Sequence, residues 1–134
     1  MKKIKIQTSI RHSLADTITP VSIYLKIRDV FPDSILLESS DYHGTDDSYS
    51  FICLKPMATF MVQNGIVSEE YPDGDRKTSN VSADNTVTNR LQQFISTFEV
   101  DTEHPEVKVN GLFGYTAYDA VKYFEKIELK SSIK

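Results

Sequence analysis

The amino-acid sequence predicts an α+β fold, in which an antiparallel sheet is flanked by about three helices. Two observations lead to this prediction. Short segments alternate apolar and polar residues between turn signals, which is typical of antiparallel strands, and longer segments repeat apolar residues at helical spacing. The segments do not follow one another as β-α-β units, so the sequence does not favour a parallel sheet.

The first strand and helix lie near the start of the chain. Residues 3–10, KIKIQTSI, alternate as a half-buried strand does. Thr19 followed by Pro20 predicts the start of a helix, because a hydroxyl caps the first turn and proline is favoured at the first helical position. Pro32 is expected to end this helix.

The middle of the chain predicts a meander of strands. Its strongest signal is Asn64-Gly65 between two strand-like segments, because both residues accept positive φ in a two-residue hairpin. A second turn is expected at residues 72–75, PDGD. The predicted strands are SILLES (34–39), SYSFICLKP (48–56), ATFMVQ (58–63), IVSEEY (66–71) and RKTSNVS (76–82).

Two further segments predict helices. Residues 85–100 begin at an Asn85 or Thr86 cap, and the loop 101–110 follows them. Residues 111–127 are expected to form a strand that enters a helix, with Asp119 as its cap. The apolar residues expected on one face of the first of these helices are Val87, Leu91, Phe94, Ile95 and Phe98.

Composition excludes several classes of protein. The chain has 134 residues, the size of one domain, and a net charge of −4 with no basic stripe, so neither nucleic acid nor an anionic membrane surface is expected as a partner. The lone Cys53 cannot form an intrachain disulfide and is expected as a buried apolar residue. No apolar run reaches transmembrane length and no signal peptide is evident, so a cytoplasmic protein is expected.

No motif for catalysis or metal binding is complete. The acidic loop around Asp41 fails as a calcium loop, since its sixth and twelfth positions are Asp46 and Ile52. His12, His43 and His104 lack the spacing of zinc ligands. Without a nucleophile, base and oxyanion hole, the chain is not expected to be an enzyme by itself.

Three segments in order resemble the N-terminal region of anthranilate synthase component I. They are LADTITPVSIYLKIRD (14–29), LLESSD…YSFICLKP (36–56) and GLFGYTAYDAVKYFE (111–125). The resemblance covers most of this chain and the front part of the family's chain. It implies that residues 1–134 are an N-terminal regulatory region, part of a larger sandwich-like fold, whose C-terminal chorismate-binding portion is absent from this chain. We expect the chain alone to be inactive; it ends at KIELKSSIK without a natural finish.

The resemblance also implies a function for the complete enzyme. The family converts chorismate and ammonia to anthranilate and pyruvate in tryptophan biosynthesis. It uses Mg²⁺, and a glutamine amidotransferase subunit supplies the ammonia. The expected partners are therefore that subunit, the chain's own catalytic portion and L-tryptophan as feedback inhibitor; no cofactor is expected in this chain.

The resemblance places the tryptophan site at the LLES motif, which corresponds here to Glu38 and Ser39. The strand that follows contributes Tyr49 and Ser50; some family members carry lysine at about Tyr49. The residue chemistry agrees, since Glu38 can accept from the ligand ammonium and the serines can donate or accept. An apolar slot for the indole is expected from Leu36, Leu37, Phe51 or Ile23.

Three alternatives remain open. Aminodeoxychorismate synthase component I, of folate biosynthesis, shares the fold and resembles this region. A stand-alone small-molecule binding module or a domain that docks the amidotransferase also agrees with the composition.

Overall fold

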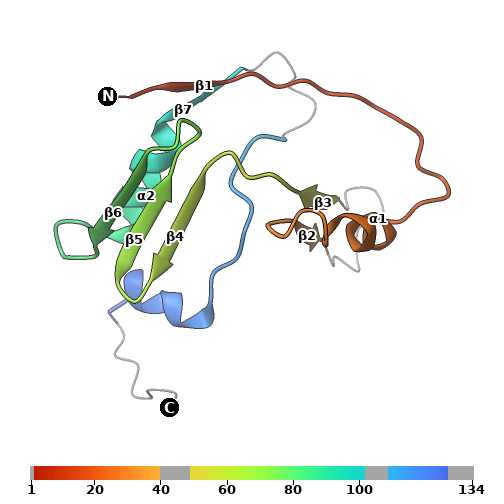
Figure 1. The fold of residues 1–134 in the computed structure, drawn as a ribbon. Helices are drawn as coiled ribbons and strands as arrows, with labels where there is room; N and C mark the ends of the chain where they lie inside the picture. The colour runs from red at the N-terminus through yellow and green to blue at the C-terminus, as the bar shows by residue number, and fades with distance from the viewer. Residues whose placement is uncertain (1, 40–48, 102–108, 127–134) are drawn as a thin grey trace. The chain divides into compact units, whose positions relative to one another are not determined.

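The structure is a computed structural model that describes residues 2–39, 49–101 and 109–126. The chain forms two compact units, one from residues 1–9 with 58–134 and the other from residues 10–57. Each unit has its own strands and at least one helix (Figure 1).

The predicted α+β class is confirmed, because three helices and antiparallel sheets are present. The first unit contains β1 (Ile4–Ile6), β4 (Thr59–Gln63), β5 (Ile66–Glu70), β6 (Arg76–Asn80), α2 (Val87–Ser96), β7 (Phe98–Val100) and the 3₁₀ helix η1 (Tyr118–Tyr123). The second unit contains α1 (Pro20–Ile27), β2 (Ile35–Glu38) and β3 (Ser50–Cys53). No helix in the described ranges is long and apolar enough to cross a bilayer.

The meander β4-β5-β6 is the largest sheet of the described chain, and both of its connections were predicted. At the first, Asn64 and Gly65 have φ angles of 52° and 75°, which a two-residue hairpin turn with positive φ at both positions requires. At the second, Gly74 has a φ of 87° and its N–H donates to the Tyr71 carbonyl at 2.9 Å. Local turn chemistry therefore sets this connectivity.

The core of the first unit lies between the meander and α2, which crosses one face of the sheet (Figure 1). Val67 and Phe94 are fully buried there. The Phe94 ring lies 5.5 Å from Phe60, 5.4 Å from Tyr71 and 5.3 Å from Phe98, measured between centroids. These aromatic contacts hold the helix to the sheet.

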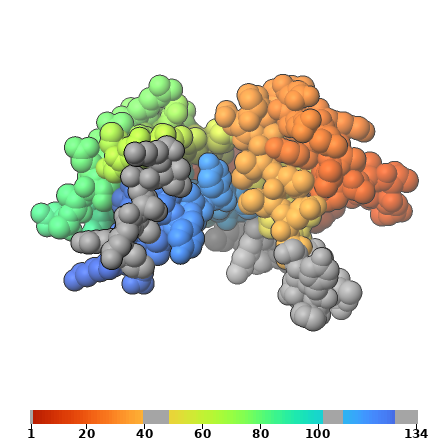
Figure 2. All heavy atoms as spheres, turned by 90° about the horizontal axis from the view of Figure 1, so that it is seen from below, coloured from red at the N-terminus to blue at the C-terminus, as the bar shows by residue number. Residues whose placement is uncertain are grey.

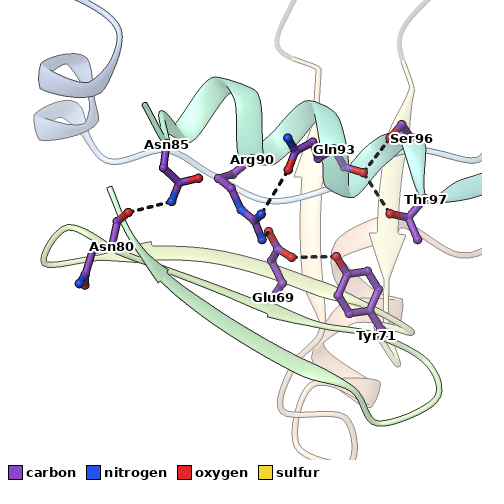
Figure 3. A network of polar contacts seen from close by, with 8 residues as sticks. All are labelled: Glu69, Tyr71, Asn80, Asn85, Arg90, Gln93, Ser96 and Thr97. Carbon is purple, nitrogen blue, oxygen red and sulfur yellow. Dashed lines mark hydrogen bonds and ion pairs between the residues drawn. The ribbon is translucent and has the colours of Figure 1, made fainter. Parts of the chain in front are cut away.

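A buried polar network crosses the same interface (Figure 3). Glu69 on β5 is only 3% exposed, and its carboxylate accepts from Arg90 Nη2 of α2 at 2.6 Å and from the Tyr71 hydroxyl at 2.7 Å. Arg90 Nη1 also donates to Gln93 Oε1 at 3.2 Å. The carboxylate is buried because a guanidinium and a phenol satisfy it.

The second predicted helix is confirmed, with a shorter span. Thr86 Oγ1 caps it by accepting from Asn89 N–H at 3.2 Å. The helix ends at Ser96, so Phe98 lies on β7 instead, and Ile95 is 49% exposed instead of facing the core. Thr97 is the C-cap of the helix, and Phe98 begins β7, where it pairs with Ile4 of β1.

The pairing of β1 with β7 was not anticipated, and it is parallel. The strand itself was predicted at residues 3–10, but only Ile4–Ile6 are paired. The first strand thus joins a segment more than ninety positions away, as the register Ile4 to Phe98 shows. The period of a strand carries no information on the direction of its partner.

The prediction for residues 111–127 is wrong in two respects. Residues 112–117 form no strand, since a strand exists only where another strand supplies its hydrogen bonds. Tyr115, in the middle of this segment, is 92% exposed. The residue at the N-cap of η1 is Ala117, which makes no side-chain bond, and Asp119 lies within the first turn. Most of the predicted loop 101–110 lies outside the described residues.

Candidate functional site

The candidate site lies on the antiparallel ribbon of β2 and β3 in the second unit. The register pairs Ile35 with Cys53, Leu36 with Ile52, Leu37 with Phe51 and Glu38 with Ser50. One further backbone bond continues the ladder, from the Ser39 N–H to the Tyr49 carbonyl at 3.2 Å. All four predicted site residues therefore lie at one end of this ribbon.

Helix α1 supports the ribbon by packing against both strands; its spheres and those of β2 form one continuous orange body in Figure 2. A reciprocal capping box begins the helix, as predicted at Thr19 and Pro20. The helix ends at Ile27, ahead of Pro32, and the Tyr24 hydroxyl donates to the Ser34 carbonyl at 3.4 Å. The chain is thereby held where it turns into β2.

The register divides the predicted residues between the two faces of the ribbon. Glu38 and Ser50 are directly opposite each other and share one face, since side chains of a cross-strand pair project to the same side. Ser39 and Tyr49 are each one position further, and regular alternation gives them the other face. One ligand can contact both sets only by lying across the end of the ribbon at Ser39 and Tyr49.

The site residues are accessible, and Glu38 forms no ion pair with a cation in the part of the chain that the structure describes. Glu38, Ser39 and Ser50 are exposed, and Tyr49 is 65% exposed. None of the ion pairs formed among the described residues involves Glu38. Its carboxylate can therefore accept from a ligand cation without first breaking an ion pair to a described residue.

The apolar residues expected around the ligand also divide by face. Leu36 shares the Glu38 side with its partner Ile52, whereas Leu37 and Phe51 share the other side. The sequence analysis did not propose Ile52. The two-residue period from Ser50 to Ile52 was the signal that would have found it.

The remaining candidates do not form a second site in the described chain. Asp41, His43 and His104 lie outside the described residues, and His12 is exposed. Cys53, which was expected to be buried, is only partly buried, and this partial burial raises the pKa of its thiol. Within residues 2–39, 49–101 and 109–126, no three side chains of His, Cys, Asp or Glu group together as a metal site would.

Comparison with curated proteins gives one consistent result. Seven proteins match, and all are named anthranilate synthase component 1. The chain is 30% identical over 116 residues to the protein from Thermus thermophilus, covering 85% of this chain and 23% of the relative. It is 36% identical over 115 residues to that of Pseudomonas putida, covering 85% and 22%, and 28% identical over 127 residues to that of Lactococcus lactis, covering 92% and 26%.

The chain thus spans about a quarter of the length of the curated relatives it matches, in their N-terminal region. No family model matches the chain, and no solved structure matches it.

Proposed function

Because the chain is similar to the N-terminal region of anthranilate synthase component 1, we propose that it forms the L-tryptophan feedback site of such an enzyme. One observation carries the proposal. The Glu38 carboxylate is exposed, has no ion-pair partner among the described residues, and lies opposite the Ser50 hydroxyl at the end of the β2–β3 ribbon. That arrangement suits a ligand with an ammonium group.

The chemistry of a free amino acid matches these residues. Its ammonium donates to the Glu38 carboxylate, a charge-assisted bond stronger than one between neutral groups. The hydroxyls of Ser39 and Ser50 and the phenol of Tyr49 are then available to the ligand carboxylate. The indole lies against apolar side chains of the ribbon and of Ile23 on α1, which is half-buried.

The complete enzyme, in this proposal, converts chorismate and ammonia to anthranilate and pyruvate. An amidotransferase subunit releases the ammonia from glutamine. We assign the chorismate site and the Mg²⁺ that it uses to a catalytic portion outside this chain, so the chain's own residues take no part in the chemical step. Its role is regulatory, and the chain is inactive alone.

Inhibition by tryptophan requires that the ligand bind two states of the enzyme with different affinity. The end of the ribbon is suited to this role because its side chains are held by short strands and are open to contact from another part of the enzyme. Tryptophan bound to Glu38 then stabilises an arrangement that is unfit for catalysis.

The proposal is tested by calorimetric titration of L-tryptophan into this chain and into two variants. Glu38→Ala removes the acceptor, and Asp33→Ala removes another exposed carboxylate of the same unit as a matched control. Loss of a hydrogen bond to a charged group predicts roughly ten- to 100-fold weaker binding for Glu38→Ala alone. Equal binding by all three proteins contradicts the site.

If the isolated chain binds no tryptophan, the same variants are compared in the complete enzyme by inhibition of anthranilate formation. Retained inhibition in the Glu38→Ala enzyme contradicts the assignment. Formation of anthranilate, which is fluorescent, also separates this proposal from aminodeoxychorismate synthase; the shared name of the seven relatives supports the anthranilate branch.

A further inference from the structure

The Asn64-Gly65 turn has a chemical property besides its role in the hairpin. When glycine follows asparagine, no side chain shields the backbone nitrogen from the asparagine side-chain amide. We propose that Asn64 is a latent site of spontaneous deamidation, and that the hydroxyl of Tyr123 on η1 restrains the reaction.

The reaction needs only water. The Gly65 backbone nitrogen loses its proton to solvent base and attacks the Asn64 side-chain carbonyl carbon. A C–N bond forms, the C–N bond to the side-chain NH₂ breaks, and the leaving group takes a proton to depart as ammonia. Water then hydrolyses either carbonyl of the cyclic imide, which gives aspartate or isoaspartate; no oxidant or reductant takes part.

The turn is open to the reaction. Asn64 is exposed, and its side chain makes none of the hydrogen bonds found among the described residues. A Cβ built on Gly65 would meet nothing within 4 Å, so no neighbouring group fills the space beside its Cα. Neither residue is buried, and each is in the accessible turn between β4 and β5.

Two hydrogen bonds hold the Gly65 backbone in place. Its N–H donates to the Tyr123 hydroxyl at 3.2 Å, and its carbonyl accepts from the Val81 N–H at 2.8 Å. The attacking nitrogen must lose its bond to Tyr123 and rotate toward the Asn64 side chain. The Val81 bond involves the Gly65 carbonyl and leaves the Gly65 nitrogen unconstrained. The bond to the Tyr123 hydroxyl is therefore the one that restrains the attacking nitrogen.

The product would alter the hairpin. Aspartate adds a negative charge to the turn, and isoaspartate adds a backbone atom to a two-residue loop. The register of β4 with β5, in which Gln63 pairs with Ile66, depends on that loop length. Displacement of η1 therefore leads to a permanent change in the sheet, independent of the tryptophan site on the other unit.

The test follows deamidation of the turn peptide by mass spectrometry during incubation at mildly alkaline pH, with isoaspartate measured separately. Tyr123→Phe removes only the hydroxyl. Tyr118→Phe is the matched control, because it removes a hydroxyl from the same 3₁₀ helix. Tyr118 is 90% exposed. Loss of one hydrogen bond predicts deamidation about two- to tenfold faster in Tyr123→Phe, and the wild-type rate in Tyr118→Phe.

Equal rates in wild type and Tyr123→Phe overturn the proposal, as does acceleration in both variants. A second measurement uses the wild-type chain alone, folded and in denaturant. The proposal requires slower deamidation of Asn64 in the folded chain, and equal rates overturn it even if Tyr123→Phe does not fold. Circular dichroism establishes that the compared variants are folded.

Discussion

The buried Glu69 shows how single residues adjust to one another in this fold. Its carboxylate receives both the Arg90 guanidinium and the Tyr71 hydroxyl (Figure 3). Removal of either partner would leave the buried Glu69 carboxylate without one of its two hydrogen-bond donors, which destabilises the fold. The alternation of Val67, Glu69 and Tyr71 puts these three side chains on one face, and their contacts with α2 show that this face is the buried one.

The Tyr71 hydroxyl gives the chain a testable dependence on alkaline pH. Burial, together with donation to Glu69, raises the pKa of Tyr71 from its ordinary value of 10.0 to about 12. Between these two pH values, the Tyr71 hydroxyl keeps its proton in the folded chain and loses it in the unfolded chain. The stabilisation from the neutral phenol is complete below pH 10 and is lost as the pH rises to about 12.

We therefore expect the difference in unfolding free energy between wild type and Tyr71→Phe to fall through this alkaline range. Urea titrations at several pH values measure it. Tyr115→Phe, which alters an exposed tyrosine, is the control and should keep the wild-type profile. A difference that stays constant with pH would contradict the assignment to Tyr71.

At the scale of elements, caps and turns explain where the helices and the hairpin begin. The cap of α2 is a single bond from Asn89 N–H to Thr86 Oγ1. Thr86→Ala leaves that N–H without its acceptor and is expected to cost about 1 kcal/mol of unfolding free energy. Urea unfolding followed by circular dichroism measures the loss.

Thr88→Ala is the matched control for this cap, because Thr88 is an exposed residue inside the same helix. Alanine has the higher helix propensity, so this variant should equal or exceed the wild type in stability. Equal losses in the two variants would show that threonine at the cap position has no special role.

At the scale of the whole molecule, each unit is small and leaves apolar side chains exposed. In the first unit the segment before and within η1 is the clearest case, with Leu112, Tyr115, Tyr118 and Phe124 all more than half exposed. Exposed apolar patches are typical of surfaces that meet other protein. The relatives, about four times as long as the matched region, have further protein that can cover such a surface.

We expect the isolated chain to bind an apolar dye while folded, and to self-associate as its concentration rises. Leu112→Ser combined with Phe124→Ser should reduce both dye fluorescence and association, because each removes exposed apolar area. Thr116→Ala, in the same segment, is the control. Sedimentation that shows a monomer at every concentration, without dye binding, contradicts the expectation.

The sequence by itself determined the local features of this protein. It predicted the capped starts of both α-helices, the Asn64-Gly65 hairpin, the turn at residues 72–75 and the strands around them. It also supported the resemblance that the curated relatives confirm. Such features depend on the chemistry of side chains within a few residues of one another, so a short stretch of sequence is enough to predict them.

Only the tertiary structure decided which distant segments meet. It paired β1 with β7 in parallel, gave residues 112–117 no strand conformation, and brought Arg90 to Glu69. It also placed Glu38 and Ser50 on one face, which the LLES motif alone does not reveal. The physical reason is that register and burial depend on a partner strand or helix, and a local pattern identifies neither.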